Sequence, residues 1–275
     1  MSDSSTSTFL IHSLEINHLW GDYETMNRIG DTWYYKIIGG GRMDACRQKN
    51  ALDFLLYSYF GITSDSEKEE LSNAALEKAY FDATQQGAFN TLVPKGKRES
   101  ARKAYDEALK VLKGKLENCA FDNYAEWHHS TCEDVCKKYK EQGLNCFTYG
   151  NAQKWVNMTM KYLYLFDSLG LKNRPIIIDE AKAKCLHVPV DSYIIESVWD
   201  KNVELPLIKE KLLKDRTKGK YNNEKVKAWS KWEDNEYQIF QKSLRKALNE
   251  ESEPIPIDWE GPAWIKQAKD RKQKK

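Results

Sequence analysis

The sequence predicts a mainly α-helical protein with a small β-hairpin near its N-terminus, and three observations support this class. Apolar residues recur at helical spacing through most of the chain after residue 45. Glycine or proline separates these stretches, and both residues end helices or form turns. Hydrophobic residues make up 41% of the 275 residues and charged residues 31%, a balance typical of a folded chain rather than a disordered one.

The first part of the chain contains the strand-like segment and two helices. Residues 32–38, TWYYKII, are β-branched and aromatic and precede three glycines, so we expect a strand in a sheet or hairpin there. Residues 50–60 are strongly apolar and predict a buried helix. Ser66 and Glu69 form a capping box, and the helical pattern after them continues to Gly87.

The same spacing of apolar residues predicts the elements in the rest of the chain. The expected helices span 98–116, 122–142, 151–168, 191–201 and 223–249. The helix over 151–168 is apolar on nearly all sides, so we expect it to cross the core. The last residues combine three prolines with Trp259 and Trp264, which indicates an extended tail packed on the body through its aromatic rings.

Basic residues are distributed unevenly, although the formal net charge of +2 neither favours nor excludes a nucleic-acid partner. Residues 95–115 carry eight Lys or Arg against three acids, residues 209–231 carry nine against three, and residues 266–275 carry six against one. Two interpretations stay open. These stretches form a phosphate-binding face, or they are solvated helix faces and a solubilising tail.

Six cysteines raise the question of a metal site. His128, Cys132 and Cys136 follow at four-residue intervals, which places them on one face of a helix. His and Cys are good zinc ligands, so zinc is one hypothesis. Structural zinc sites usually draw ligands from two separated pairs, however, and Cys is also a common small buried residue. We therefore expect no metal, with zinc at these three residues as the alternative.

The chain lacks targeting, membrane and cofactor signatures. Its start, MSDSSTSTFL, has no basic n-region and no apolar core, and no apolar run reaches the roughly 20 residues of a membrane span. We therefore expect a cytoplasmic protein with free thiols and no membrane partner, although a nucleoid or nuclear location is equally compatible. Walker A, GxGxxG, HExxH and GxSxG motifs are absent, so we expect no cofactor. The sequence also lacks the helical Arg-x4-His pair of an RNA-cutting enzyme.

The most informative stretch begins at Gly150, a turn residue before the expected start of the helix over 151–168. This start places Lys154 in the first turn, beside the positive end of the helix dipole. A cation is electrostatically misplaced there, and burial would favour the neutral amine. A lysine that is readily neutral at pH 7 can act as a nucleophile.

The stretch ends at Asp191, which follows Pro189 and Val190. The proline holds the chain extended, and Asp191 is a good N-cap for the helix over 191–201. Amide donors at a helix start favour the ionised carboxylate. A carboxylate there that faces a cleft can stabilise a developing cation.

Together these residues resemble the helix-hairpin-helix DNA glycosylases, and the 8-oxoguanine DNA glycosylases in particular. The resemblance covers about residues 147–199: Lys154 matches the nucleophilic lysine of the family, Asp191 its aspartate, and Gly150 the first glycine of the G-x-G-x-K hairpin. Ala152 stands where the family has the second glycine, and the lysine and the aspartate are further apart in the sequence. The resemblance implies a mainly α orthogonal helical array.

It also implies a base-excision enzyme of DNA repair, a hydrolase and lyase that acts on a flipped damaged or modified base. Lys154 would attack C1′ of the nucleoside and form a Schiff base, and Asp191 would stabilise the sugar cation. Trp155 and Trp199 would line the pocket for the flipped base, although both tryptophans are more often core residues.

The resemblance implies how the chain binds DNA and how it divides. The amides of Gly150, Asn151 and Ala152 would hold a DNA phosphate. The expected regions are a helical part with possible short strands over 1–145, a glycosylase-like part over 146–265 and a basic tail over 266–275. A single compact unit is the alternative.

A second class of function is a non-catalytic helical module that keeps the fold and binds nucleic acid or protein. A purely structural interpretation of the two residues also stays open, in which Asp191 only caps its helix and Lys154 faces solvent. Residues 228–248 carry an aromatic stripe formed by Trp229, Trp232, Tyr237 and Phe240. Such a stripe most often packs into the core, but an exposed one would be a partner surface.

Overall fold

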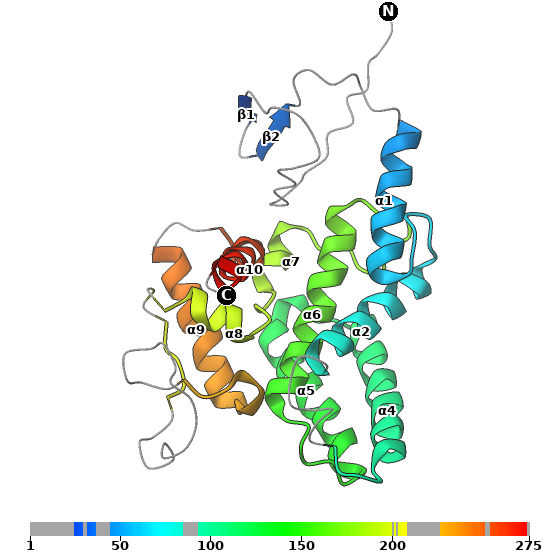
Figure 1. Cartoon of the computed structure of the whole chain (residues 1–275), viewed down its shortest axis with the longest axis vertical. Coiled ribbons are helices and arrows are strands. Elements are labelled where there is room, and N and C mark those ends of the chain that lie inside the picture. The colour runs from blue at the N-terminus through cyan, green and yellow to red at the C-terminus, as the bar shows by residue number, and fades with distance from the viewer. Residues whose placement is uncertain are drawn as a thin grey trace, which may run out of the picture. The chain divides into compact units, whose positions relative to one another are not determined.

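The described part of the protein is mainly helical (Figure 1). In this computed structural model it comprises residues 25–29, 32–36, 45–84, 93–199, 201, 203–207, 226–250 and 254–273. The triple glycine at 39–41 and most of the basic stretch 209–231 lie outside these residues. The mainly α class predicted from apolar spacing is confirmed, while the orthogonal glycosylase-like arrangement stays a proposal.

The described residues divide into two compact units. The first contains those up to Ala74 together with Tyr164–Ile177, and the second contains Ala75–Leu163 and those from Ile178 onward. The division falls inside helices α2 (Lys68–Thr84) and α6 (Tyr149–Ser168). The three regions predicted from the sequence, with boundaries after residues 145 and 265, stay a prediction.

The first unit contains a β-hairpin whose strands are β1 (Thr25–Ile29) and β2 (Thr32–Lys36). The two strands are antiparallel, and their register places Thr25 opposite Lys36 and Ile29 opposite Thr32. Strand β2 lies inside the segment 32–38 that its β-branched and aromatic composition marked as a strand. The hairpin expected near the N-terminus is therefore present.

Helix α1 (Ala45–Phe60) differs from its prediction as a buried helix. Leu56 is buried, and the ring of Phe60 packs edge to face against Phe166 with 4.9 Å between centroids. Four large apolar side chains on this helix are exposed: Phe54, Leu55, Tyr57 and Tyr59. Consecutive apolar residues point to all sides of a helix, so the run suggested burial all round, whereas α1 buries only part of its circumference.

The second unit is built from helices. Besides the parts of α2 and α6 that belong to this unit, they are α4 (Arg98–Glu117), α5 (Tyr124–Glu141), α7 (Glu180–Cys185), α8 (Ser192–Ser197), α9 (Asp234–Glu250) and α10 (Pro256–Gln273), with the short 3-10 helices η1 (Phe121–Asn123) and η3 (Trp229–Lys231). Helix α4 packs along α5, and α10 packs against α8. Apolar side chains at four-residue intervals on α4 form its buried face, as helical spacing predicted.

Helix α6 supplies the core of the second unit. Every residue from Tyr149 to Met160 is buried, so the prediction that this apolar helix crosses the core is confirmed. The ring N–H of Trp155 donates to the carbonyl of Leu76 at 2.9 Å, which satisfies the one polar group of that buried side chain. Five polar or charged side chains of α6 are buried as well: Asn151, Gln153, Lys154, Asn157 and Thr159.

The last helix, α10, corrects the prediction of an extended tail. Pro256 occupies its first position, where the missing N–H of proline would have no helical partner anyway. Pro262 lies inside the helix, which continues through Trp264 to Gln273. The prolines therefore mark the first turns of a helix rather than an extended segment, and residues 266–273 of the expected basic tail are helical.

Two other predicted helices are shorter in the structure. The one expected over 191–201 is α8, which ends at Ser197. The one expected over 223–249 becomes η3 followed by α9, because the amide of Glu233 bonds to the carboxylate of Glu236 and starts a new helix. No helix among the described residues is long and apolar enough to cross a bilayer.

Candidate functional site

Lys154 and Asp191, the two residues singled out in the sequence, form an ion pair. Nζ of Lys154 lies 2.8 Å from Oδ2 of Asp191. Lys154 belongs to α6, and Asp191 is the residue directly before α8. Two helices that are separate in the sequence therefore bring together an amine and a carboxylate.

The carboxylate of Asp191 makes four hydrogen bonds, two on each oxygen. Oδ1 accepts from the amides of Tyr193 and Ile194 at 2.9 and 3.0 Å, which is the N-cap geometry predicted for Asp191 from the sequence. Oδ2 accepts from Lys154 and from the ring N–H of Trp264 at 3.1 Å. The capping oxygen and the oxygen that faces the lysine are therefore different atoms.

Burial and these donors act in opposite directions on the Asp191 carboxyl. Burial by itself raises its pKa, but the charge of Lys154 and the hydrogen bonds from Lys154, Ile194 and Trp264 outweigh it. The pKa of Asp191 therefore lies below its usual value of 3.8. The side chains of Lys154 and Asp191 are 7% and 15% exposed, so the pair is a largely desolvated one.

The position of Lys154 along α6 differs from the prediction. The helix begins at Tyr149 rather than at 151 or 152, so Lys154 lies in the second turn and not in the first. The field of a helix terminus falls off within the first turn. The dipole argument made from the sequence therefore does not apply, and the charged neighbour of Lys154 is the carboxylate of Asp191.

The residues proposed as a DNA-phosphate site, Gly150, Asn151 and Ala152, are all buried in the first turn of α6. The amides of Asn151 and Ala152 both donate to the carbonyl of Thr148 at 3.0 Å. A Cβ on Gly150 would lie 2.2 Å from the carbonyl oxygen of Trp229, so glycine is required there. Phosphate binding by this turn would require the 229–230 backbone to move away.

The two tryptophans predicted to line a base pocket lie in different surroundings. Trp155 is fully buried and packs against Tyr80, with 4.8 Å between ring centroids, and against Tyr105. It is therefore a core residue of the second unit. Trp199 follows α8 and is half-buried.

Two aromatic residues beside the ion pair were missed in the sequence. Trp264 of α10 donates to Asp191 and packs on Tyr193 of α8, with 4.8 Å between ring centroids. Both rings are partly exposed. Arg271 lies 3.9 Å over the Tyr193 ring and pairs with Glu196 at 2.8 Å, which ties α10 to α8. Because the tail was expected to be extended, its pattern gave no sign of where Trp264 would lie.

The zinc alternative is not supported by the geometry. Within the residues that the structure describes, no three His, Cys, Asp or Glu side chains are grouped so that they could hold a metal ion. The sulfur of Cys132 lies 3.8 Å from the ring nitrogens of His128, and both are buried. His128 instead stacks on Tyr237 in the core, and burial lowers its pKa to about 3, so the imidazole is neutral.

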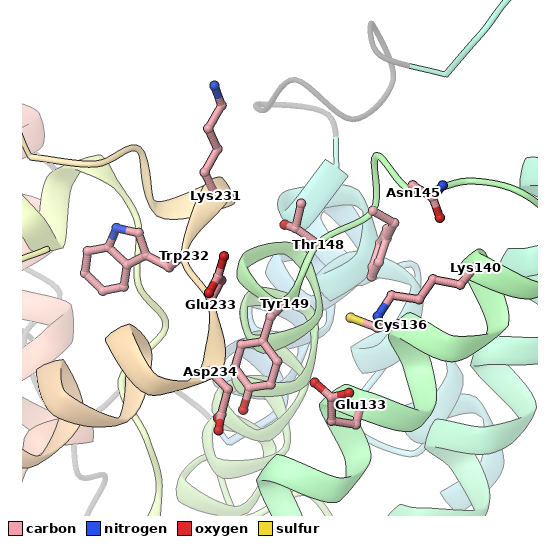
Figure 2. A pocket seen from close by; sticks show the side chains of 11 residues that line it. Glu133, Cys136, Lys140, Asn145, Thr148, Tyr149, Lys231, Trp232, Glu233 and Asp234 are labelled. Atoms are coloured by element: carbon pink, nitrogen blue, oxygen red, sulfur yellow. The ribbon is translucent and has the colours of Figure 1, made fainter. Parts of the chain in front are cut away.

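A pocket of about 330 Å³ lies elsewhere in the second unit, between α5, the turn before α6 and residues 231–234 (Figure 2). Its charged lining residues are Glu133, Lys140, Lys231, Glu233 and Asp234. Since acids and lysines line it together, the pocket presents no single sign of charge to a ligand. Neither Lys154 nor Asp191 lines it, so the pocket and the ion pair are separate features.

The aromatic stripe predicted over 228–248 faces inward for most of its length. Trp232, Tyr237 and Phe240 are buried, and the ring of Trp232 packs on that of Phe240 at 5.2 Å. Trp229 is half-buried and belongs to η3 rather than to α9. The core-facing interpretation of the stripe therefore holds for its three buried members.

No protein-family model matches the chain, and no curated protein or solved structure shows significant similarity to it.

Proposed function

We propose that the chain is a DNA base-excision glycosylase-like protein in which Lys154 is the nucleophile and Asp191 its electrostatic partner. The observation that carries the proposal is their contact. They lie 37 positions apart in the sequence, and yet an amine and a carboxylate meet at 2.8 Å, at the two positions that resemble the catalytic residues of helix-hairpin-helix glycosylases.

The pair fits the chemistry of base excision. Attack of the neutral amine of Lys154 on C1′ forms a C–N bond and breaks the glycosidic bond, and the base leaves with the electron pair and gains a proton. Opening of the sugar ring then gives a Schiff base to Lys154. The ammonium proton of Lys154 must be lost to solvent before the attack, and Oδ2 of Asp191, which is within hydrogen-bond distance of the amine, orients it toward C1′.

Asp191 also suits the charge that develops on the sugar. Since its pKa is lowered, the carboxyl is ionised at neutral pH, and four donors fix its direction. A fixed anion in a largely desolvated place stabilises an adjacent cation more strongly than a hydrated anion does. The partly exposed rings of Trp264 and Tyr193, next to this carboxylate, are suitable neighbours for a flipped base.

The DNA backbone would be held by basic side chains rather than by the buried first turn of α6. Most Lys and Arg residues between 95 and 115 are exposed on or just before α4. Contacts of lysine and arginine with phosphates release counterions, so DNA binding should weaken steeply with salt.

A non-catalytic binding module is the second candidate, and one specific observation favours it. The Lys154 side chain is 7% exposed and already paired, and the nearby amides of Asn151 and Ala152 are occupied. A fold that had kept the pair only for stability would have these features. In that case Lys154 and Asp191 form a buried structural ion pair, and DNA or protein binds elsewhere.

Borohydride trapping on a panel of duplexes that carry varied damaged or modified bases separates the two candidates. Borohydride reduces the Schiff base to a stable amine, so a glycosylase with a lysine nucleophile gives a covalent protein–DNA adduct. A gel shift over a salt series is run on the same duplexes. An adduct supports the enzyme, salt-sensitive binding without adduct or abasic product supports the module, and the absence of both contradicts any DNA-directed role.

A further inference from the structure

Residues 186–190, which lead directly into Asp191, are buried but belong to no helix or strand. In the described part of the chain, strands occur only in the hairpin of β1 and β2, so no strand pairs with this segment. Buried backbone N–H and C=O groups nevertheless need partners. Side chains of α6 and α9 bond to the carbonyls of Leu186, Val188 and Val190 and to the amide of Val188.

Helix α9 holds the segment at two places. Gln241 pairs twice with Val188: its Nε2 donates to the carbonyl at 2.7 Å, and its Oε1 accepts from the amide at 3.1 Å. One turn later, Arg245 donates to the carbonyls of Cys185 and Leu186 at 2.9 and 2.6 Å, and also to that of Lys184. Because the side-chain amide of Gln241 binds both the N–H and the C=O of Val188, a shift of the segment by one residue would break both hydrogen bonds.

Helix α6 holds the same segment beside the ion pair. Gln153 donates to the carbonyl of Val190 at 3.4 Å, and the next residue, Lys154, pairs with Asp191. Consecutive residues of α6 therefore contact the last residue of the segment and Asp191, which follows it. Asn157, one turn further along, donates to the carbonyl of Val188 at 3.4 Å and to Oε1 of Gln153 at 3.0 Å.

We propose that Gln153 and Gln241 are positioning residues that fix segment 186–190 and thereby hold the carboxylate of Asp191 against the amine of Lys154. They act through Asp191 and need no contact with a substrate. The position of Asp191 follows from these hydrogen bonds alone. The expected effect of Gln153 and Gln241 on borohydride trapping, in contrast, rests on the proposed function.

The ring N–H of Trp264 provides a readout of this position that does not depend on activity, because it donates to Oδ2 of Asp191. Its resonance in a ¹H–¹⁵N spectrum of the full chain at neutral pH is assigned with Trp264→Phe, and Asp191→Asn gives the shift without the carboxylate. The variants are Gln241→Met and Gln153→Met, which keep the side-chain length but remove the hydrogen bonds. Thr159→Val is the control, since it removes a buried hydroxyl of α6 that bonds to Trp155 and not to the segment.

We expect the Trp264 resonance of both Gln variants to move toward that of Asp191→Asn and that of Thr159→Val to stay at the wild-type position. Wild-type shifts in Gln241→Met and Gln153→Met would overturn the proposal. Gln153→Met removes a single bond to the segment, at 3.4 Å, together with the bonds of Gln153 to Gly150 and Asn157 inside α6, so it decides the question even if Gln241→Met fails to fold.

Trapping separates this proposal from the proposed function. On a duplex to which wild type becomes covalently trapped, the Gln variants should form the adduct on the order of 10²-fold more slowly, because misplacing a reacting group by about 1 Å has an effect of this size. A moved Trp264 resonance with no trapping by wild type contradicts the enzyme but supports the positioning role. Trapping by wild type with unmoved resonances and unchanged rates in the variants supports the enzyme and contradicts the positioning role.

Discussion

The ring N–H of Trp264 lies 3.1 Å from Oδ2 of Asp191, the same oxygen that faces Lys154. Helix α10 thus contributes directly to the surroundings of the candidate catalytic pair. Loss or displacement of α10 would remove one of the four donors that hold the carboxylate.

Asp191→Asn should destabilise the protein by about 3 kcal/mol, because it leaves the largely buried ammonium of Lys154 without a counter-charge. Asparagine can still cap α8, so the loss reports the ion pair rather than the cap. The free energy of unfolding from urea denaturation measures the effect. A loss below about 1 kcal/mol would mean that the pair is as weak as an exposed one.

The stabilisation from Asp191 should depend on pH in a defined direction. Its pKa is lower in the folded protein, so its contribution is complete above the unfolded value of 3.8 and disappears as the pH falls through the folded value. The difference in unfolding free energy between wild type and Asp191→Asn should therefore be flat near neutral pH and shrink in acid. Buried His128 and His187, whose pKa values are lowered by burial, weaken both proteins below about pH 6.5 and cancel in this difference. A difference that grows in acid would contradict the account.

Gly150→Ala should destabilise the protein by about 1–3 kcal/mol, because the added Cβ would meet the backbone of Trp229 and Ser230. The matched control is Gly114→Ala on the exposed side of α4, where a Cβ meets nothing within 4 Å. That change should stabilise by roughly 0.5–1 kcal/mol, since alanine favours a helix over glycine. Thermal unfolding measures the change in stability of each variant relative to wild type. Equal changes would show that the backbone of Trp229 and Ser230 does not approach Gly150 closely.

Tyr237→Phe should cost about 1–3 kcal/mol, because one hydroxyl serves several buried groups. It lies 2.8 Å from Nδ1 of His187, 2.8 Å from Nδ2 of Asn157 and 3.3 Å from Nε2 of His128. Removing the hydroxyl takes one hydrogen-bond partner from each of these three buried side chains. Tyr57→Phe is the control, because the Tyr57 side chain is exposed on α1, and it should change stability by less than about 0.5 kcal/mol. Equal stabilities for the two variants in urea would contradict the network.

The helical class and the buried course of α6 could be predicted because both depend on local apolar spacing. The N-cap role of Asp191 was also readable, since it follows from a proline-containing segment before a helix. The meeting of Lys154 with Asp191 was suggested only by resemblance, because 37 positions separate them and no local rule connects them.

Other features could not be read because tertiary packing decided them. Trp264 was placed on an extended tail since prolines usually break helices, yet Pro256 falls at a first position where they do not. The apolar run of α1 predicted burial, but what surrounds a helix is not encoded in its own composition. The polar partners of segment 186–190 come from α6 and α9, so the segment gave no local sign of them.

The most direct test of the central claim is to find the residue that carries the reduced DNA adduct, by peptide mass spectrometry after borohydride trapping. The account predicts modification at Lys154, loss of the adduct in Lys154→Gln and its retention in Lys161→Gln. Lys161 is the matched control because it lies on the same helix and pairs with a buried carboxylate, that of Glu260. An adduct on another amine, or equal trapping by wild type and Lys154→Gln, would contradict the assignment of Lys154 as the nucleophile.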